Sequence, residues 1–366
     1  MITKFSVQNF KGFQDNFTFD LTQSNYEFNQ GAVRNGIVNK GLIYGFNGCG
    51  KSNLGLAIFD LVLHLTDKQT IIGKYPVYLN LDSNEKYASF SYSFVFDGVL
   101  VEYSYTKVDP QVLRTEELII NGEPVIGYDF EKETGFSNLD GTQNLRLNSP
   151  DSRLSKLKFI KNNAILAENE TNLIFIKFMD FVERMLLFYS LDGNAYQGFT
   201  LGVESLDDVI VKEGKLKDFE RLLKKADINM NLESQLINNQ NVIFSKYKNG
   251  LIPFERSASR GTNSLELFYF WYIRMSKASF VFIDEFDAFY HYELSELIIR
   301  ELLKLYDTQI ILTTHNTDLL TNDLLRPDCY YIMNPKNIVS IANSTEKELR
   351  KAHNLQKMFK AGAFNE

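Results

Sequence analysis

Apolar and polar residues alternate in several stretches of the first half of the chain, a pattern that predicts half-buried strands. It marks a strand pair within residues 2–22 and two longer stretches at 90–96 and 101–105. The dipeptides Asp97-Gly98 and Asn121-Gly122 favour two-residue hairpin turns next to such stretches. The N-terminal part is therefore predicted to contain an antiparallel β-hairpin lobe.

Short, largely apolar runs occur at residues 41–44, 280–283 and 309–312. Runs of this kind fit a parallel sheet that helices cover on both faces. Helix-like spacing follows the first run and recurs over 152–190 and 213–226. The fold is therefore predicted to be α/β.

Composition and charge narrow the classes of function. The chain has 366 residues, 39 Lys and Arg against 46 Asp and Glu, and a net charge of −7. Such a chain is no constitutive, non-specific nucleic-acid binder, because it lacks a global positive field. Two cysteines, Cys49 and Cys329, are too few for a disulfide framework. Charged residues interrupt the most apolar stretch, 173–189, so we expect a soluble, cytoplasmic protein without a membrane partner.

Residues 45–52 fit the pattern G-x-x-x-x-G-K-[ST], between a predicted strand and a predicted helix. In this pattern the glycines let backbone N–H groups turn toward phosphates. Lys51 would neutralise the β and γ oxygens, and the Ser52 hydroxyl would hold Mg²⁺. The alternative is a chance match in a loop, which this strand-loop-helix context disfavours.

The apolar run at 280–283 ends in two carboxylates, Asp284 and Glu285. Asp284 is predicted to bind Mg²⁺ opposite Ser52, and Glu285 to act as the general base on the attacking water. The alternative is a pair of acids that cap a helix. Asp287 either contacts a second subunit or caps a predicted helix over 288–302.

The run at 309–312 leads into Thr313-Thr314-His315, and a histidine at a strand end can hydrogen-bond a γ-phosphate. His64 and His353 are predicted to be structural, and the sequence leaves His291 open.

A Ser-x-Gly turn at Ser259 and Gly261 precedes a predicted helix over 265–273. The free N–H groups at a helix N-terminus can bind an anion. The alternative is an ordinary helix cap.

These four motifs, in this order, resemble those of the ATP-binding-cassette ATPases of the SMC, recombination and repair type. Residues 45–53 are similar to their G-x-N-G-x-G-K-S-N loop, and 283–287 and 313–316 to their D-E-x-D and T-T-H-N forms. Residues 258–262 resemble the L-S-G-G-Q signature, from which Arg260 and Thr262 depart. The resemblance implies that ATP is bound by Gly45, Phe46, Asn47, Gly48, Cys49, Gly50, Lys51, Ser52 and Asn53, and that Ser259, Gly261 and Thr262 close over the ATP of a partner subunit.

The chain also resembles a narrower group, the AbiL/RloA-type ATPases of bacterial abortive-infection systems. Similar segments are 324–328, 223–228 and the ending 350–359. In that group the ATPase works with a separately encoded effector, for which a Toprim-like or HNH-like nuclease is the expected type. Residues 316–366 are too few for the Toprim domain that related nucleases carry there, so we expect this chain to be the ATPase alone.

Together these patterns predict a P-loop NTPase of the ABC-ATPase type, with a mixed or parallel sheet flanked by helices. We expect residues 1–145 to form the first half of the head, 146–250 an inserted helical lid, and 251–366 the second half. A homodimer or a higher even oligomer that shares its ATP sites is implied.

Three functions remain open. The first is an ATP-hydrolysing switch that senses a phage-derived trigger and controls an effector. The others are a DNA-repair ATPase whose dimer clamps DNA directly, and a scaffold with negligible turnover. Direct nucleic-acid binding stays open. A mixed basic and apolar pattern over 343–366 predicts a C-terminal helix that either docks the effector or packs on its own core.

Overall fold

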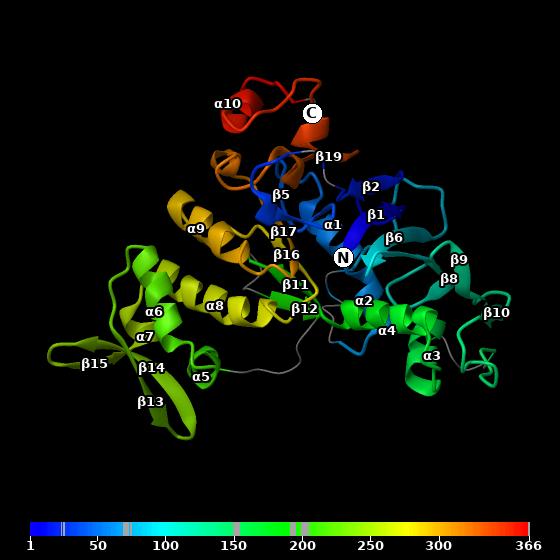
Figure 1. Cartoon of the computed structure of the whole chain (residues 1–366), viewed down its shortest axis with the longest axis horizontal. Helices are drawn as coiled ribbons and strands as arrows, with labels where there is room; N and C mark the ends of the chain where they lie inside the picture. Colours follow the sequence, from blue (N-terminus) through cyan, green and yellow to red (C-terminus); the bar gives the residue numbers. More distant parts are fainter. Residues whose placement is uncertain are drawn as a thin grey trace.

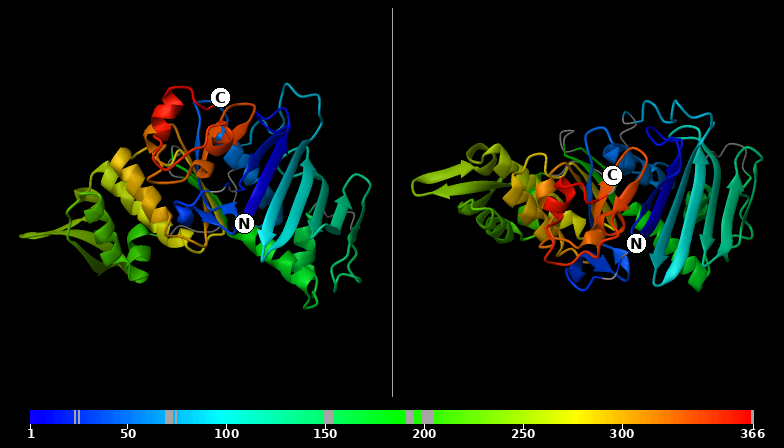
Figure 2. Two further views of the ribbon diagram at one scale, coloured as in Figure 1. Left: turned by 45° about the horizontal axis from the view of Figure 1, so that its top comes forward. Right: turned by 90° about the horizontal axis from the view of Figure 1, so that it is seen from above.

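Two seven-stranded sheets lie side by side, and a smaller lobe projects from one of them (Figure 1). In Figure 2 the first sheet stands at one side of the molecule and the projecting lobe at the other. The structure is a computed structural model that describes residues 1–22, 24, 26–68, 73, 75–148, 154–190, 195–198 and 205–364.

The first sheet is antiparallel throughout, in the order β10-β9-β8-β7-β6-β1-β2. It contains the predicted strand pair and both predicted hairpin turns, which are thereby confirmed. Its strands are β1 (Ile2–Gln8), β2 (Phe17–Asp20), β6 (Ala88–Phe96), β7 (Val99–Lys107), β8 (Leu113–Ile120), β9 (Glu123–Asp129) and β10 (Thr134–Ser137).

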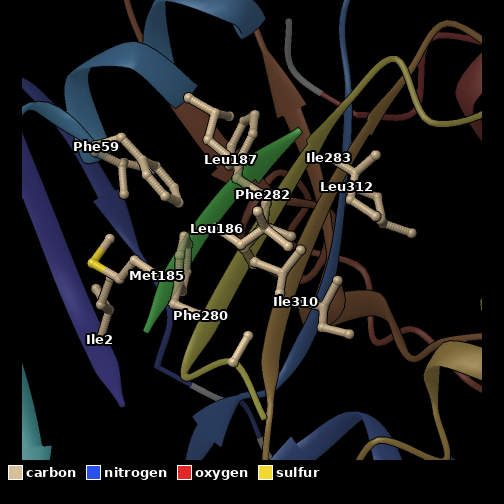
Figure 3. Close-up of a cluster of buried hydrophobic side chains, with 14 of the residues drawn as sticks. Ile2, Phe59, Met185, Leu186, Leu187, Phe280, Phe282, Ile283, Ile310 and Leu312 are labelled. Atoms are coloured by element: carbon tan, nitrogen blue, oxygen red, sulfur yellow. The ribbon is translucent and has the colours of Figure 1, made fainter. Parts of the chain in front are cut away.

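The second sheet forms the core of the head, in the order β12-β11-β16-β17-β5-β18-β19. Its five central strands are parallel and its two edge strands are antiparallel. The strands are β5 (Lys40–Tyr44), β11 (Met185–Tyr189), β12 (Ala195–Gly198), β16 (Phe280–Asp284), β17 (Gln309–Thr314), β18 (Tyr330–Met333) and β19 (Ile338–Ser340). Figure 3 shows the apolar side chains of β11, β16 and β17 packed into one buried cluster. The three apolar runs predicted to be parallel strands are therefore confirmed.

The predicted lid over 146–250 differs from the structure. Its stretch Met185–Tyr189 is β11, which is fully buried and pairs with β16 in the core sheet. The helices before it, α3 (Lys156–Asn163) and α4 (Glu170–Glu183), contact the antiparallel sheet. A short apolar run cannot be distinguished from a buried helix segment by periodicity, so the sequence pattern merged β11 with α4.

The helix-like spacing that follows the first apolar run corresponds to two helices, divided at Phe59: α1 (Lys51–Ile58) and α2 (Asp60–Leu65). Helix α1 lies close to the core sheet, because a Cβ on Gly55 would stand 2.9 Å from the Phe282 ring. On the other side, the hydroxyl of Tyr92 from β6 donates to the carbonyl of Ala57, at 3.0 Å. The helix that begins at the glycine-rich loop is therefore held between the two sheets.

A buried ion pair fixes α2 to the antiparallel sheet. The Lys107 ammonium donates to the Asp60 carboxylate at 2.7 Å, and both side chains are fully buried. Burial lowers the pKa of Lys107, while Asp60 opposes this shift. The Tyr105 hydroxyl donates to the same carboxylate at 2.9 Å. Removing either charged partner alone would leave an uncompensated buried charge, so this pair fixes the position of α2 strongly.

The projecting lobe, here called the lid, comprises residues 205–259 and the first part of the following helix. A three-stranded antiparallel sheet forms its outer part, so the lid is not purely helical as predicted. Its elements are α5 (Leu206–Lys212), α6 (Leu216–Lys225), β13 (Leu232–Ile237), β14 (Gln240–Tyr247), β15 (Gly250–Pro253), α7 (Phe254–Ser257) and α8 (Arg260–Met275). Helix α8 connects the lid to the core sheet (Figure 1).

A carboxyl pair lies between α5 and α8. Glu266 is 5% exposed, and its carboxyl group interacts with that of Asp207. Burial, and then the neighbouring Asp207, raise the pKa of Glu266 to about 9. The folded chain therefore retains a proton on Glu266 that the unfolded chain releases above its ordinary pKa of 4.5. Stability from this group is present below pH 4.5 and is lost as the pH rises toward 9.

Glu266→Gln is expected to stabilise the chain increasingly as the pH rises from 5 to 8, by up to about 4 kcal/mol. Glutamine retains a hydrogen-bonding group of the same size and removes the ionisation. Thermal melts of parent and variant across this range measure the effect, with Glu233→Gln at a partly exposed site in β13 as the matched control. A stability difference that stays constant with pH would contradict the assignment.

The C-terminal helix is shorter than predicted over 343–366: α10 spans only Leu355–Lys360. Leu349 and Leu355 are buried, and the ring of Phe359 packs against Tyr44 at 4.8 Å. The apolar side chains thus pack on the chain's own core, which was the alternative to a docking helix.

The other elements of the described residues are helix α9 (Tyr292–Leu302), the two-residue strands β3 (Val33–Arg34) and β4 (Ile37–Val38), and the 3-10 turns Gln30–Ala32, Thr317–Leu319, Pro327–Cys329 and Ile341–Asn343.

Candidate active site

The glycine-rich loop connects the end of β5 to the start of α1, as predicted. Gly50 precedes the helix with φ +105°, a left-handed conformation that glycine adopts at little cost. Gly45 is confined instead, since a Cβ there would stand 2.6 Å from the Cys49 sulfur and 2.8 Å from the Met333 carbonyl oxygen. The backbone consequently has the tight form of a phosphate-binding loop.

The side chains of the loop divide into a buried and an exposed group. Lys51 and Cys49 are buried, whereas Phe46 is 61% exposed at the tip. Asn47 and Gly48 are also exposed, and Asn53 is half-buried in the first turn of α1. The tip is therefore free to meet a ligand or a second surface, while the base of the loop is fixed.

The Lys51 ammonium lies back over the loop. It donates to the carbonyl oxygens of Gly45 at 2.9 Å and Phe46 at 3.3 Å. It also lies 3.0 Å from Nε2 of His315, at the end of β17. Burial lowers the pKa of Lys51, and the neighbouring acids oppose this shift.

Ser52 and Asp284 meet across the loop. The Ser52 hydroxyl donates to one carboxylate oxygen of Asp284 at 2.6 Å, and the Thr313 hydroxyl donates to the other at 2.8 Å. Burial raises the pKa of Asp284, and these two hydrogen bonds oppose the shift. A hydroxyl and a carboxylate at the end of a strand are hard oxygen ligands of the kind Mg²⁺ prefers, so the predicted magnesium pair fits the geometry.

Glu285 has an unusual backbone conformation for a residue with a side chain, with φ +49°. Its N–H donates to the Thr313 hydroxyl at 2.7 Å, and its carboxylate lies 3.1 Å from Nε2 of His315. A protonated Nε2 lets His315 donate to Glu285, and the Lys51 ammonium lies within 3.4 Å of both ring nitrogens. The structure thus brings together Lys51 from the start of α1, Glu285 after β16 and His315 after β17.

Asp287 does not cap a helix, contrary to one of the two interpretations of the sequence. The helix predicted over 288–302 begins later, as α9 (Tyr292–Leu302), and its N-cap is His291. The His291 ring nitrogen Nδ1 accepts from the N–H of Leu294 at 3.3 Å, which gives this histidine a structural contact. The Asp287 carboxylate accepts from the Thr314 hydroxyl at 2.7 Å, and burial raises its pKa.

The predicted signature begins α8 in the lid. The Ser259 side chain caps the helix by accepting from the N–H of Thr262 at 3.2 Å, and Gly261 lies in the first turn. At 1.5 Å per residue, α8 is about 24 Å long, and its C-terminal end leads into β16. Figures 1 and 2 show the N-terminal end of α8 in the lid, away from α1. Within one chain the structure therefore does not bring the signature to the glycine-rich loop.

The contacts of Thr313 and Thr314 were not predicted. Their position directly before His315 was the one feature of the sequence that pointed to them. Their hydroxyls reach the carboxylates of Asp284 and Asp287 only because β16 pairs with β17. The other histidines have structural contacts as predicted: His64 Nε2 lies 2.8 Å from the Tyr103 hydroxyl, and His353 Nδ1 accepts from the N–H of Arg350.

The fold and this arrangement of motifs define a P-loop ATPase of the ABC type. The family model described as "AAA domain, putative AbiEii toxin, Type IV TA system" matches residues 42–321, and the chain belongs to this family. It is thus an ATPase. No curated protein matches the chain in sequence.

Among solved structures, the SMC head domain from Thermotoga maritima is 14% identical, with 93% of this chain and 98% of that chain covered and a TM-score of 0.48. The Smc head domain with a coiled coil and joint from Pyrococcus yayanosii is 12% identical, with 99% of each chain covered and a TM-score of 0.46. A Pyrococcus furiosus Smc head domain bound to the C-terminal domain of ScpA is 15% identical, with 98% of each chain covered and a TM-score of 0.42.

None of the helices in the described ranges combines the length and the apolar character needed to cross a lipid bilayer.

Proposed function

We propose that this ATPase is the nucleotide-gated subunit of a bacterial abortive-infection system, acting in the cytoplasm as a dimer that controls a separate effector. The family to which the chain belongs carries the name of an abortive-infection toxin, and this supports the anti-phage role. The proposed gating rests on one observation: the Ser259 cap, at the start of α8 in the lid, lies away from the glycine-rich loop of its own chain. A second copy would supply the signature to each ATP.

In this proposal the residues act on ATP as follows. The loop N–H groups and the Lys51 ammonium bind the β and γ phosphates. Ser52 and Asp284 would hold Mg²⁺, which when bound neutralises charge on the phosphate oxygens. Glu285 orients the attacking water and accepts its proton, and His315 contacts the γ-phosphate.

The dimer closes through contacts across the two shared sites. Ser259, Gly261 and Thr262 of one copy meet the γ-phosphate held by the other, where the N-terminal end of α8 offers free N–H groups and the positive end of its dipole. Asp287 lies two residues after Glu285 and is proposed to contact the partner copy. Hydrolysis removes the γ-phosphate, so the dimer opens and the state of the effector changes.

We expect phage protection or toxicity only when the chain is expressed with the neighbouring effector gene, and we expect Lys51→Ala to change that outcome. The physical reason is that Lys51 holds the nucleotide that closes the dimer. The plating efficiency of phage measures the protection. It is compared between cells that express the chain alone, the chain with the effector, and the Lys51→Ala chain with the effector. Lys336→Ala, at an exposed loop lysine, is the matched control.

The purified chain is expected to hydrolyse ATP and to leave plasmid DNA and tRNA intact. Nuclease activity of the isolated chain that is lost with Asp284→Ala would overturn the division of labour. ATP-dependent retention of DNA by the chain without an effector would favour the DNA-clamping alternative instead.

A further inference from the structure

Three consecutive residues at the end of β17 each contact a different acid of residues 284–287, here called the acidic turn, which comprises the last residue of β16 and the start of the turn that follows it. The Thr313 hydroxyl hydrogen-bonds Asp284 at 2.8 Å, and the Thr314 hydroxyl hydrogen-bonds Asp287 at 2.7 Å. His315 hydrogen-bonds Glu285 at 3.1 Å. The turn carries the acids proposed to bind magnesium and to activate water. Its geometry is therefore determined by the neighbouring strand as well as by its own sequence.

Thr313 makes three of the contacts that hold this turn. Its hydroxyl donates to Asp284 at 2.8 Å and accepts the N–H of Glu285 at 2.7 Å. Its backbone carbonyl accepts the N–H of Phe286 at 3.1 Å. One fully buried side chain thus satisfies a carboxylate and a backbone N–H at once.

The bond to the Glu285 N–H matters because the backbone there is strained. A φ of +49° places Glu285 in the left-handed region, which a residue with a Cβ adopts only at an energetic cost. A strained conformation persists only where surrounding contacts determine it. Without the Thr313 hydroxyl the Glu285 N–H would lose its acceptor, and the turn could relax to a less strained form that moves the carboxylate away from His315.

We propose that Thr313 is a positioning residue of the ATPase: its hydroxyl holds the left-handed turn at Glu285 and orients Asp284, and so places both carboxylates for hydrolysis. This inference rests on the proposed roles of Asp284 and Glu285. Thr313 itself touches neither ATP nor water in this scheme and acts only through the two acids.

Thr313→Val keeps the β-branched shape and removes the hydroxyl. We expect it to lower kcat by about 10- to 100-fold, as is usual when a group that orients a ligating side chain is lost. KM and the affinity for ATP measured without magnesium should stay within about twofold of the parent, because the loop and Lys51 are unchanged. Thr313→Ser, which retains the hydroxyl, should restore most of kcat.

Hydrogen exchange supplies a readout that does not depend on activity. In Thr313→Val the Glu285 amide loses its acceptor, so the peptide that contains residues 280–290 should exchange faster, while the peptides of the glycine-rich loop should not change.

Thr308→Val is the matched control. Thr308 is equally buried, and its hydroxyl donates to the carbonyls of Met275 and Ala278 at the opposite end of β17. This variant should lose a similar amount of thermal stability, with kcat and the exchange of the acidic turn unchanged.

The double variant Thr313→Val with Glu285→Gln shows whether the loss of kcat in Thr313→Val is caused by a displaced Glu285. If Thr313 acts mainly by placing Glu285, Thr313→Val should lower the residual turnover of Glu285→Gln by much less than it lowers that of the parent. Should Thr313→Val not fold, Thr313→Cys, whose thiol is a poorer donor and acceptor, replaces it.

Parental kcat in Thr313→Val, or a loss equal to that in Thr308→Val, would overturn the inference even if Glu285→Gln is inactive. A fully active Glu285→Gln would instead overturn the proposed base, and the exchange of the 280–290 peptide would still decide whether Thr313 holds the turn.

Discussion

Glu285→Gln is expected to bind ATP like the parent chain and to hydrolyse it at least ~100-fold more slowly, the usual scale of loss for a general base. Glutamine keeps the size of the side chain, and its amide oxygen can still accept from Nε2–H of His315, which lies 3.1 Å from the carboxylate. The amide cannot accept a proton from water. The variant should therefore stay closed as a dimer in ATP, and steady-state turnover together with size-exclusion chromatography in ATP measures both effects.

The position of Glu285 explains why the substitution Glu285→Gln is expected to lower turnover without a loss of ATP binding. Its side chain is 23% exposed and that of His315 is 34% exposed, so both can reach a bound nucleotide while the strand ends beneath them are buried. Glu293→Gln is the matched control, because that side chain lies on the first turn of α9 and is 80% exposed. Turnover of Glu285→Gln at the parental rate, with Glu293→Gln unchanged, would show that another group accepts the proton.

Local patterns predicted the loop and the strand ends because each depends on residues close together in the sequence. The glycine-rich loop has a fixed spacing, and the apolar runs of β5, β16 and β17 are bounded by clear helical patterns. Parallel pairing then places the ends of these strands at one edge of the sheet. Residues at the three strand ends could therefore be assigned to one site before their distances were known.

Contacts that depend on tertiary packing could not be predicted in the same way. Nothing near Thr313 in the sequence indicates that its hydroxyl lies between Asp284 and the N–H of Glu285. The left-handed backbone at Glu285 is likewise stabilised by a neighbouring strand, whereas the sequence offers neither a glycine nor an asparagine there. Strand β11 was missed for a different reason: only Arg184 separates it from the apolar face of α4.

Lys51→Ala and Ser259→Arg are each expected to abolish ATP turnover alone and to restore part of it when mixed. If each site combines the loop of one copy with the signature of the other, a mixed dimer has one site with both lesions and one site with neither. In an equal mixture about half of the dimers are mixed when exchange is random. Turnover of the mixture should therefore reach about a quarter of the parental value, whereas sites contained within single chains would leave the mixture inactive.

The structure also determines how this experiment is controlled. Ser259 caps α8 by accepting the Thr262 N–H at 3.2 Å, so its replacement costs about 1 kcal/mol of helix stability even without a partner. Ser259→Ala removes the same cap without adding a bulky cation, and it should retain more turnover than Ser259→Arg if the arginine acts by blocking a partner's phosphate. Equal losses in both variants, with no recovery on mixing, would mean that Ser259 only stabilises the lid. Recovery in the mixture, together with a loss of parental turnover when the parent chain is mixed with a chain that carries both Lys51→Ala and Ser259→Arg, would demonstrate the shared site. In that mixed dimer each shared site combines one intact motif with one lesion, whereas sites contained within single chains would leave the parent copy active.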